Sequence, residues 1–208
     1  MTHEPETTAA DIAWMRKLAE EGADAPMRGA PILMFSGLIY GAASIVAWLA
    51  AVDLIPLTAN QASMSWLVAT LVFWAMLAVM IPRLRRAGDA CTTANRASGI
   101  AWSGVGWGIF ALAIAMSILG WRLGPTAGPA LFALIPSIIM VFYGAGWAVS
   151  AALFKNRTMW LLSAASFVAA PLLAVFAGQA SQYLAYAVAL FGLMALPGYL
   201  FMRAANRT

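Results

Sequence analysis

Residues 31–52 read PILMFSGLIYGAASIVAWLAAV, a long run without a single charged side chain. About 20 such residues are enough for a helix to cross the ~30 Å hydrocarbon layer of a bilayer. Apolar residues occur on every face of this run, so it lacks the strict alternation of a barrel strand. A backbone in lipid must satisfy its own hydrogen bonds, and the run is therefore predicted to form a membrane-spanning helix.

The whole chain has the same character. Of its 208 residues, 63% are hydrophobic and 10% are charged, and the mean hydropathy is +0.82. Soluble domains carry about 25% charged residues, so this composition excludes a soluble globular fold. The fold class predicted is an all-α, polytopic integral membrane protein.

Five further apolar runs follow the first, each ended by charged, proline or glycine residues. The predicted spans are 31–52, 64–81, 98–120, 129–154, 158–177 and 182–202. They form a membrane domain over 30–203, preceded by a tail over 1–29 and followed by a short tail over 204–208. The last two runs are joined by small uncharged residues, so a re-entrant pair is the alternative to two spans, although the full length of both favours two.

The basic residues predict the orientation, because cytoplasmic loops are enriched in Lys and Arg. With six spans and a cytoplasmic N-terminus, only Arg122 of the twelve basic residues lies outside. The predicted cytoplasmic set is Arg16, Lys17, Arg28, Arg83, Arg85, Arg86, Arg96, Lys155, Arg157, Arg203 and Arg207. Both ends are therefore expected in the cytoplasm of a bacterial cell, with the domain in its inner membrane. Within this set Arg83, Arg85 and Arg86 are expected to meet lipid headgroups.

The tail contains an amphipathic segment over 8–21, which is predicted to be a helix that does not cross the membrane. One interpretation is an interfacial helix on the inner leaflet, and the other is a docking helix for a cytoplasmic partner. The residues expected to make either contact are Ile12, Trp14, Met15, Arg16, Lys17 and Leu18.

The middles of the spans contain no Asp, Glu, Lys, Arg or His, and buried ionisable residues are the usual mark of a proton or ion path. No pattern of nucleophile and base, of metal ligands or of a phosphate-binding loop occurs, so no enzyme, metal or cofactor is predicted. The lone Cys91 and the lone His3 argue against a disulfide or a metal cluster. Basic residues are not gathered on one face, which argues against nucleic acid.

Several aromatic residues fall near mid-depth, where a Trp N–H or Tyr O–H needs a partner. They are Tyr40, Trp74, Trp107, Tyr143 and Trp147. One interpretation is a packed core with hydrogen bonds between helices, and the other is a pocket for an apolar or cationic ligand. Pro136, Pro171 and Pro197 interrupt the last three helices, and each can kink its helix and free a backbone carbonyl.

Small residues such as Gly37 and Gly41 are spaced for close helix packing, within the chain or at a homo-oligomer seam. Together these features predict an accessory or regulatory subunit that acts by associating with another membrane or cytoplasmic protein. The alternative is a small channel or facilitator lined by the mid-depth aromatic residues.

Overall fold

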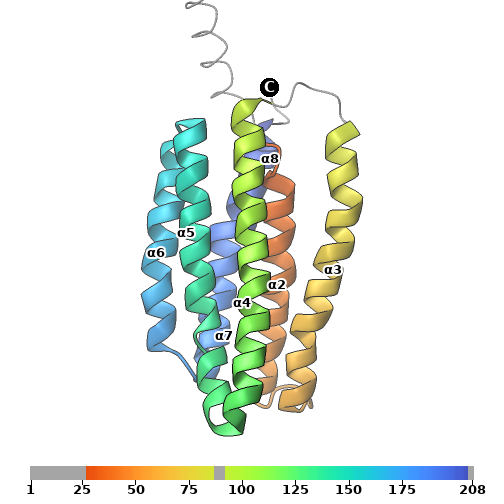
Figure 1. Ribbon diagram of the computed structural model, residues 1–208, viewed down its shortest axis with the longest axis vertical. Helices are drawn as coiled ribbons and strands as arrows, with labels where there is room; N and C mark the ends of the chain where they lie inside the picture. Colours follow the sequence, from red (N-terminus) through yellow and green to blue (C-terminus); the bar gives the residue numbers. More distant parts are fainter. Residues whose placement is uncertain (1–26, 87–91, 206–208) are drawn as a thin grey trace, which may run out of the picture.

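The computed structural model describes residues 27–86 and 92–205, and these are helical with short connections and no strand (Figure 1). The elements are α2 (Ala30–Ala51), α3 (Ala59–Arg86), α4 (Thr93–Phe132), α5 (Ile135–Phe154), α6 (Arg157–Val175), α7 (Ala180–Leu190), the π-helical turn η1 (Phe191–Ala195) and α8 (Leu196–Ala205). The predicted helix over 8–21 and Cys91 lie outside the described residues.

Six of the helical stretches are long and apolar enough to span a membrane, which confirms the predicted number. They are Ala30–Ala51, Asn60–Leu84, Thr93–Gly124, Gly128–Phe154, Arg157–Val175 and Ala180–Ala205. The last two are each long enough for a full crossing, as the interpretation with two spans requires. The second and third helices extend beyond the predicted spans at both ends, because a helix continues through polar residues that hydropathy assigns to loops.

Breaks in the helices occur where glycine and proline change the backbone. Gly124 has φ 76° and ψ −175°, a conformation that favours glycine, and it separates the third span from the fourth. Pro136 lies in the first turn of α5, where its missing N–H disrupts no helical bond. It therefore begins a helix rather than interrupting one, whereas Pro171 lies inside α6.

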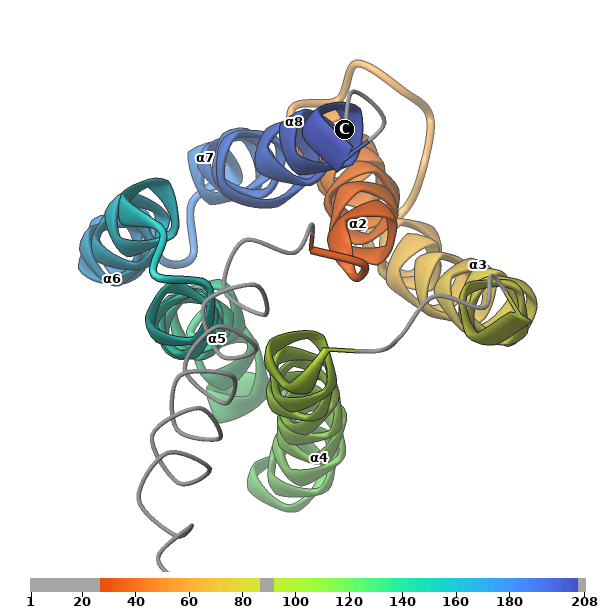
Figure 2. The ribbon, with the colours of Figure 1, turned by 90° about the horizontal axis from the view of Figure 1, so that it is seen from above.

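The helices form an open bundle rather than a closed ring (Figure 2). The densest packing joins α5 to α6 and α2 to α7, η1 and α8. The extensive contacts of α3 are with α2, and those of α4 are with α5. Two long helices, α3 and α4, therefore stand at the edges of the bundle with little of their surface buried.

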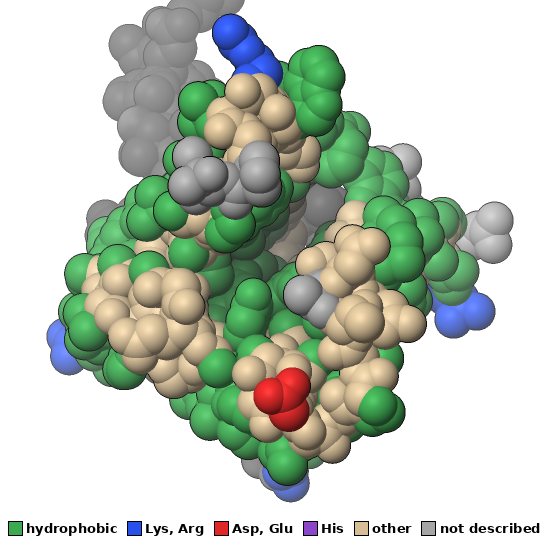
Figure 3. All heavy atoms as spheres, turned by 90° about the horizontal axis from the view of Figure 1, so that it is seen from below, with side chains coloured by type: hydrophobic (Ala, Val, Ile, Leu, Met, Phe, Trp, Pro, Cys, Tyr) green, Lys and Arg blue, Asp and Glu red, His purple; other side chains and the backbone are tan. Residues whose placement is uncertain are grey.

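The helices alternate in direction, so helix ends and connections that carry Lys or Arg come together at one end of the bundle. We call this the basic end; among the described Lys and Arg residues, only Arg122 lies at the opposite end. Asp53, the one acidic residue in the described part of the chain, also lies at that opposite end. Figure 3 shows that end, with a single acidic side chain in view and with Lys and Arg side chains at the rim of the molecule.

Candidate functional site

Trp147 lies at the centre of the packed core and is fully buried. Its indole N–H donates a hydrogen bond of 3.1 Å to the carbonyl oxygen of Leu193. That carbonyl is free because Pro197, four residues further along, has no N–H to donate. The mid-depth indole and the carbonyl freed by proline, which the sequence predicts separately, are thus partners for each other.

A second polar contact joins α4 to α5 nearer the basic end. The indole N–H of Trp102 donates to Ser150 Oγ at 3.0 Å, and Ser98 Oγ lies 3.1 Å from the same oxygen. The Trp102 ring also meets Trp147 edge to face, with centroids 5.2 Å apart. The sequence does not single out Trp102, although its spacing of four residues from Ser98 places both on one helical face.

Three tyrosines from different helices form what we call the tyrosine cluster: Tyr40 of α2, Tyr143 of α5 and Tyr186 of α7. Tyr143 and Tyr186 belong to the buried core, and Tyr40 is partly buried and packs against that core. The Tyr40 hydroxyl lies 3.4 Å from Thr70 Oγ1 of α3. Two of the three were predicted, but Tyr186 was not.

Trp66 also belongs to this region, since its ring lies 6.1 Å from that of Tyr186. The sequence places Trp66 near the end of a span, as in an interfacial belt. α3 begins at Ala59, so Trp66 lies about two turns into the helix, and its place in an interfacial belt stays a prediction.

The remaining predicted aromatic residues, Trp74 and Trp107, lie apart from this core. Their rings meet edge to face at 5.9 Å between α3 and α4, and Phe110 contacts both. Trp74 is 47% exposed and Trp107 is 59% exposed. The structure therefore divides the five predicted pocket residues between a packed interior and an exposed contact of two edge helices.

The side of α4 that faces α2 is not covered. Trp102 points toward α5 and Trp107 toward α3. At 3.6 residues per turn the shorter arc between them carries Gly99, Ser103 and Gly106, with Phe110 following about one turn further on. The two glycines and Ser103 are exposed. A Cβ atom added to Gly99 or Gly106 would meet no atom within 4 Å. We call this surface the inner face of α4.

Near the basic end, however, α4 is held to the start of α2. The backbone N–H of Arg28 donates to Asn95 Oδ1 at 2.9 Å. The side chain of Thr92 caps α4 by accepting from the Asn95 N–H. The inner face of α4 is therefore uncovered, although the first turn of α4 is held to the start of α2.

The predicted headgroup residues Arg83, Arg85 and Arg86 lie in the last turn of α3 at the basic end. The described residues contain no group of three or more His, Cys, Asp or Glu that could hold a metal ion.

The fold and these surfaces fit one class, a multi-pass helical membrane protein. Comparison of the chain with protein-family models, with curated proteins and with solved structures finds no match.

Proposed function

We propose that this chain is an accessory or regulatory subunit of a bacterial inner membrane, acting by association with another membrane protein. The concentration of Lys and Arg at the basic end supports a cytoplasmic position for that end, and hence for both chain termini. The uncharged span interiors favour association over ion-coupled transport.

The observation that carries the proposal is the uncovered inner face of α4. The span Thr93–Gly124 is apolar, yet none of its most hydrophobic window is buried within the chain. A helix whose extensive packing is with one neighbour, as that of α4 is with α5, has most of its surface available for contacts outside the chain. Its inner face lies between helices rather than on the convex outside of the bundle (Figure 2).

The chemistry of the inner face fits a transmembrane helix as the partner. Association of helices in lipid depends on close van der Waals packing, which small residues permit. Gly99, Ser103 and Gly106 are spaced at i, i+4 and i+7, so they form one stripe along α4. We propose that the partner is another membrane protein. If the protein captured at this face is a second copy of the chain, the association is homo-oligomeric instead.

The amphipathic segment over 8–21 is proposed as a second contact, with the partner or with the membrane surface. Its residues Ile12, Trp14, Met15, Arg16, Lys17 and Leu18 would act at the basic end. Deleting residues 1–22 removes this second contact and leaves the contact at the inner face of α4 in place.

Photo-crosslinking in native membranes tests the proposal. A photoreactive amino acid at position 103 is expected to give a discrete adduct, identified by mass spectrometry as one partner protein. The matched control is position 161, because Leu161 is exposed on α6 at the far side of the bundle. A Gly106→Leu change should abolish the adduct by filling the stripe. Equal labelling at both positions, or no adduct at 103, would contradict the proposal.

The tyrosine cluster favours a second candidate, a facilitator for an apolar or cationic ligand. Aromatic faces attract cations, and three tyrosines from α2, α5 and α7 lie in or against the buried core. The two candidates differ in whether the chain works alone. Purified protein in vesicles should accelerate ethidium efflux only if it is a facilitator, and Tyr143→Phe should then reduce the rate.

A further inference from the structure

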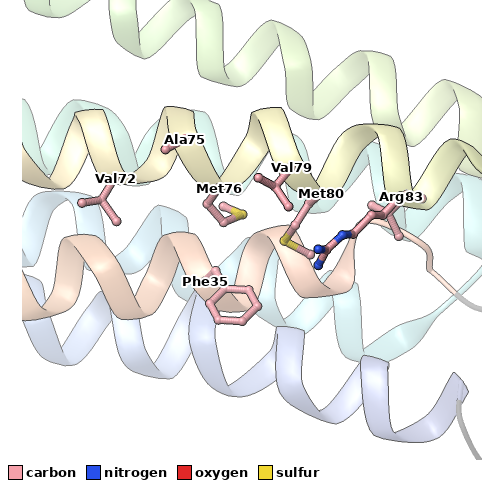
Figure 4. Close-up of a pocket in the computed structure, with 8 residues that line it drawn as sticks. Phe35, Val72, Ala75, Met76, Val79, Met80 and Arg83 are labelled. Atoms are coloured by element: carbon pink, nitrogen blue, oxygen red, sulfur yellow. The ribbon is translucent and has the colours of Figure 1, made fainter.

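An apolar groove runs along the outer side of α3, away from α4 (Figure 4). It has a volume of about 680 Å³ and is bordered by Phe35 of α2 and by residues of α3 that repeat every three or four positions. The α3 residues are Val72, Ala75, Met76, Val79, Met80, Arg83 and Leu84. Small-molecule sites have volumes of roughly 300–1,000 Å³, so the groove is of a size that holds a ligand.

Arg83 is the only polar residue of the lining, and it lies at the basic end of the groove. Its guanidinium group reaches back toward Met80 in Figure 4. Asp53 carries the one carboxylate in the described part of the chain, and it lies at the opposite end of the bundle from Arg83. A cation at one end of an apolar groove is complementary to an anion joined to an apolar chain.

The length of the groove matches one leaflet. From Val72 to Arg83 the helix rises about 16 Å. Half of the hydrocarbon layer is about 15 Å thick. An acyl chain that starts at the level of Arg83 would therefore end near Val72, at the middle of the bilayer.

The geometry points to a binding site for one anionic phospholipid at this groove, with its phosphate on Arg83 and an acyl chain along α3. Guanidinium binds phosphate through two parallel hydrogen bonds, which a headgroup-level Arg is placed to donate. The thioether side chains of Met76 and Met80 adapt readily to the irregular surface of a flexible chain. The site is independent of the inner face of α4, because it lies on the other side of α3.

The test uses the full chain in detergent micelles, titrated with phosphatidylglycerol or phosphatidylcholine of identical acyl chains and observed by native mass spectrometry. The wild type is expected to bind one phosphatidylglycerol in preference to phosphatidylcholine. Arg83→Gln should weaken phosphatidylglycerol binding about tenfold, which corresponds to about 1.4 kcal/mol. Val79→Trp should weaken the binding of both lipids by filling the groove.

The matched control is Arg157→Gln, which removes the same charge from the same end on α6, across the bundle from α3. This change should leave both affinities as in the wild type, and circular dichroism checks that every variant keeps its helical content. Equal loss in the two Arg variants, or no preference for phosphatidylglycerol in the wild type, would overturn the inference. So would a dimer that Val79→Trp dissociates, because the occupant would then be a second copy.

Discussion

Gly37→Ala is expected to destabilise the protein, because α2 crosses η1 there with no room for a Cβ atom. An added Cβ would lie 2.5 Å from the backbone nitrogen of Ala195 and 2.9 Å from both Ala195 Cβ and the carbonyl oxygen of Leu190. Two of these neighbours are backbone atoms that cannot rotate away. The helices must therefore separate by on the order of 1 Å to reach ordinary contact, which weakens dispersion contacts along the crossing.

The magnitude follows from two opposing terms. Overpacking of this kind costs about 1–3 kcal/mol. Replacing a helical glycine by alanine returns about 0.5–1 kcal/mol. Two of the close contacts are with backbone atoms, so the upper half of the overpacking range applies, and the net expectation is a loss of about 1–2.5 kcal/mol in the free energy of unfolding, or roughly a 5–70-fold change in the equilibrium constant.

Unfolding in mixed micelles with increasing sodium dodecyl sulfate, followed by circular dichroism, measures the difference. The control is Gly106→Ala, since a Cβ there meets nothing within 4 Å. It should leave stability unchanged or raise it by up to about 1 kcal/mol. The reasoning is refuted if Gly37→Ala is as stable as the wild type or shifts the transition no more than Gly106→Ala does.

Two other predictions concern polar bonding and orientation. Gln182→Leu should lower the free energy of unfolding by about 1–3 kcal/mol in the same assay. The buried Gln182 amide donates to the carbonyl oxygens of Ala133 and Leu173 and accepts from the Gly178 N–H, and leucine can replace none of these bonds. The control is Gln179→Leu, which changes an exposed neighbour and should have little effect. A membrane-impermeant maleimide should label Cys91 only after the cells are permeabilised, whereas Asp53→Cys in a Cys91→Ser background should react in intact cells; the opposite pattern would reverse the proposed topology.

Part of the site could be predicted from residue type and depth. Trp147 was expected to need a hydrogen-bond partner, and it is buried and donates to the Leu193 carbonyl; Tyr143 is buried in the same core. The packing role of Gly37 is likewise confirmed, since its missing side chain admits the backbone of η1. These predictions succeed because desolvating a polar atom or packing two backbones depends on local chemistry that the residue type already specifies.

The rotation of each helix about its own axis, which decides the face that points into the bundle, could not be predicted. Trp74 and Trp147 are both mid-depth tryptophans, yet one is 47% exposed and the other is fully buried. In a run that is apolar on every face there is no polar side to show which direction is outward. For the same reason Trp102 and Tyr186 could not be distinguished in advance from aromatic residues that face lipid.

The sequence by itself determined that the chain has six apolar helices and a strongly uneven distribution of basic residues between their ends. These are consequences of hydrophobic length and charge, which are properties read along the chain. Only the tertiary structure decided that Trp147 binds the carbonyl freed by Pro197, that α4 leaves its inner face uncovered, and that Arg83 stands at the end of an apolar groove. Each of these depends on which helices are neighbours and how they are rotated, and both are set by the packing of side chains from segments far apart in sequence.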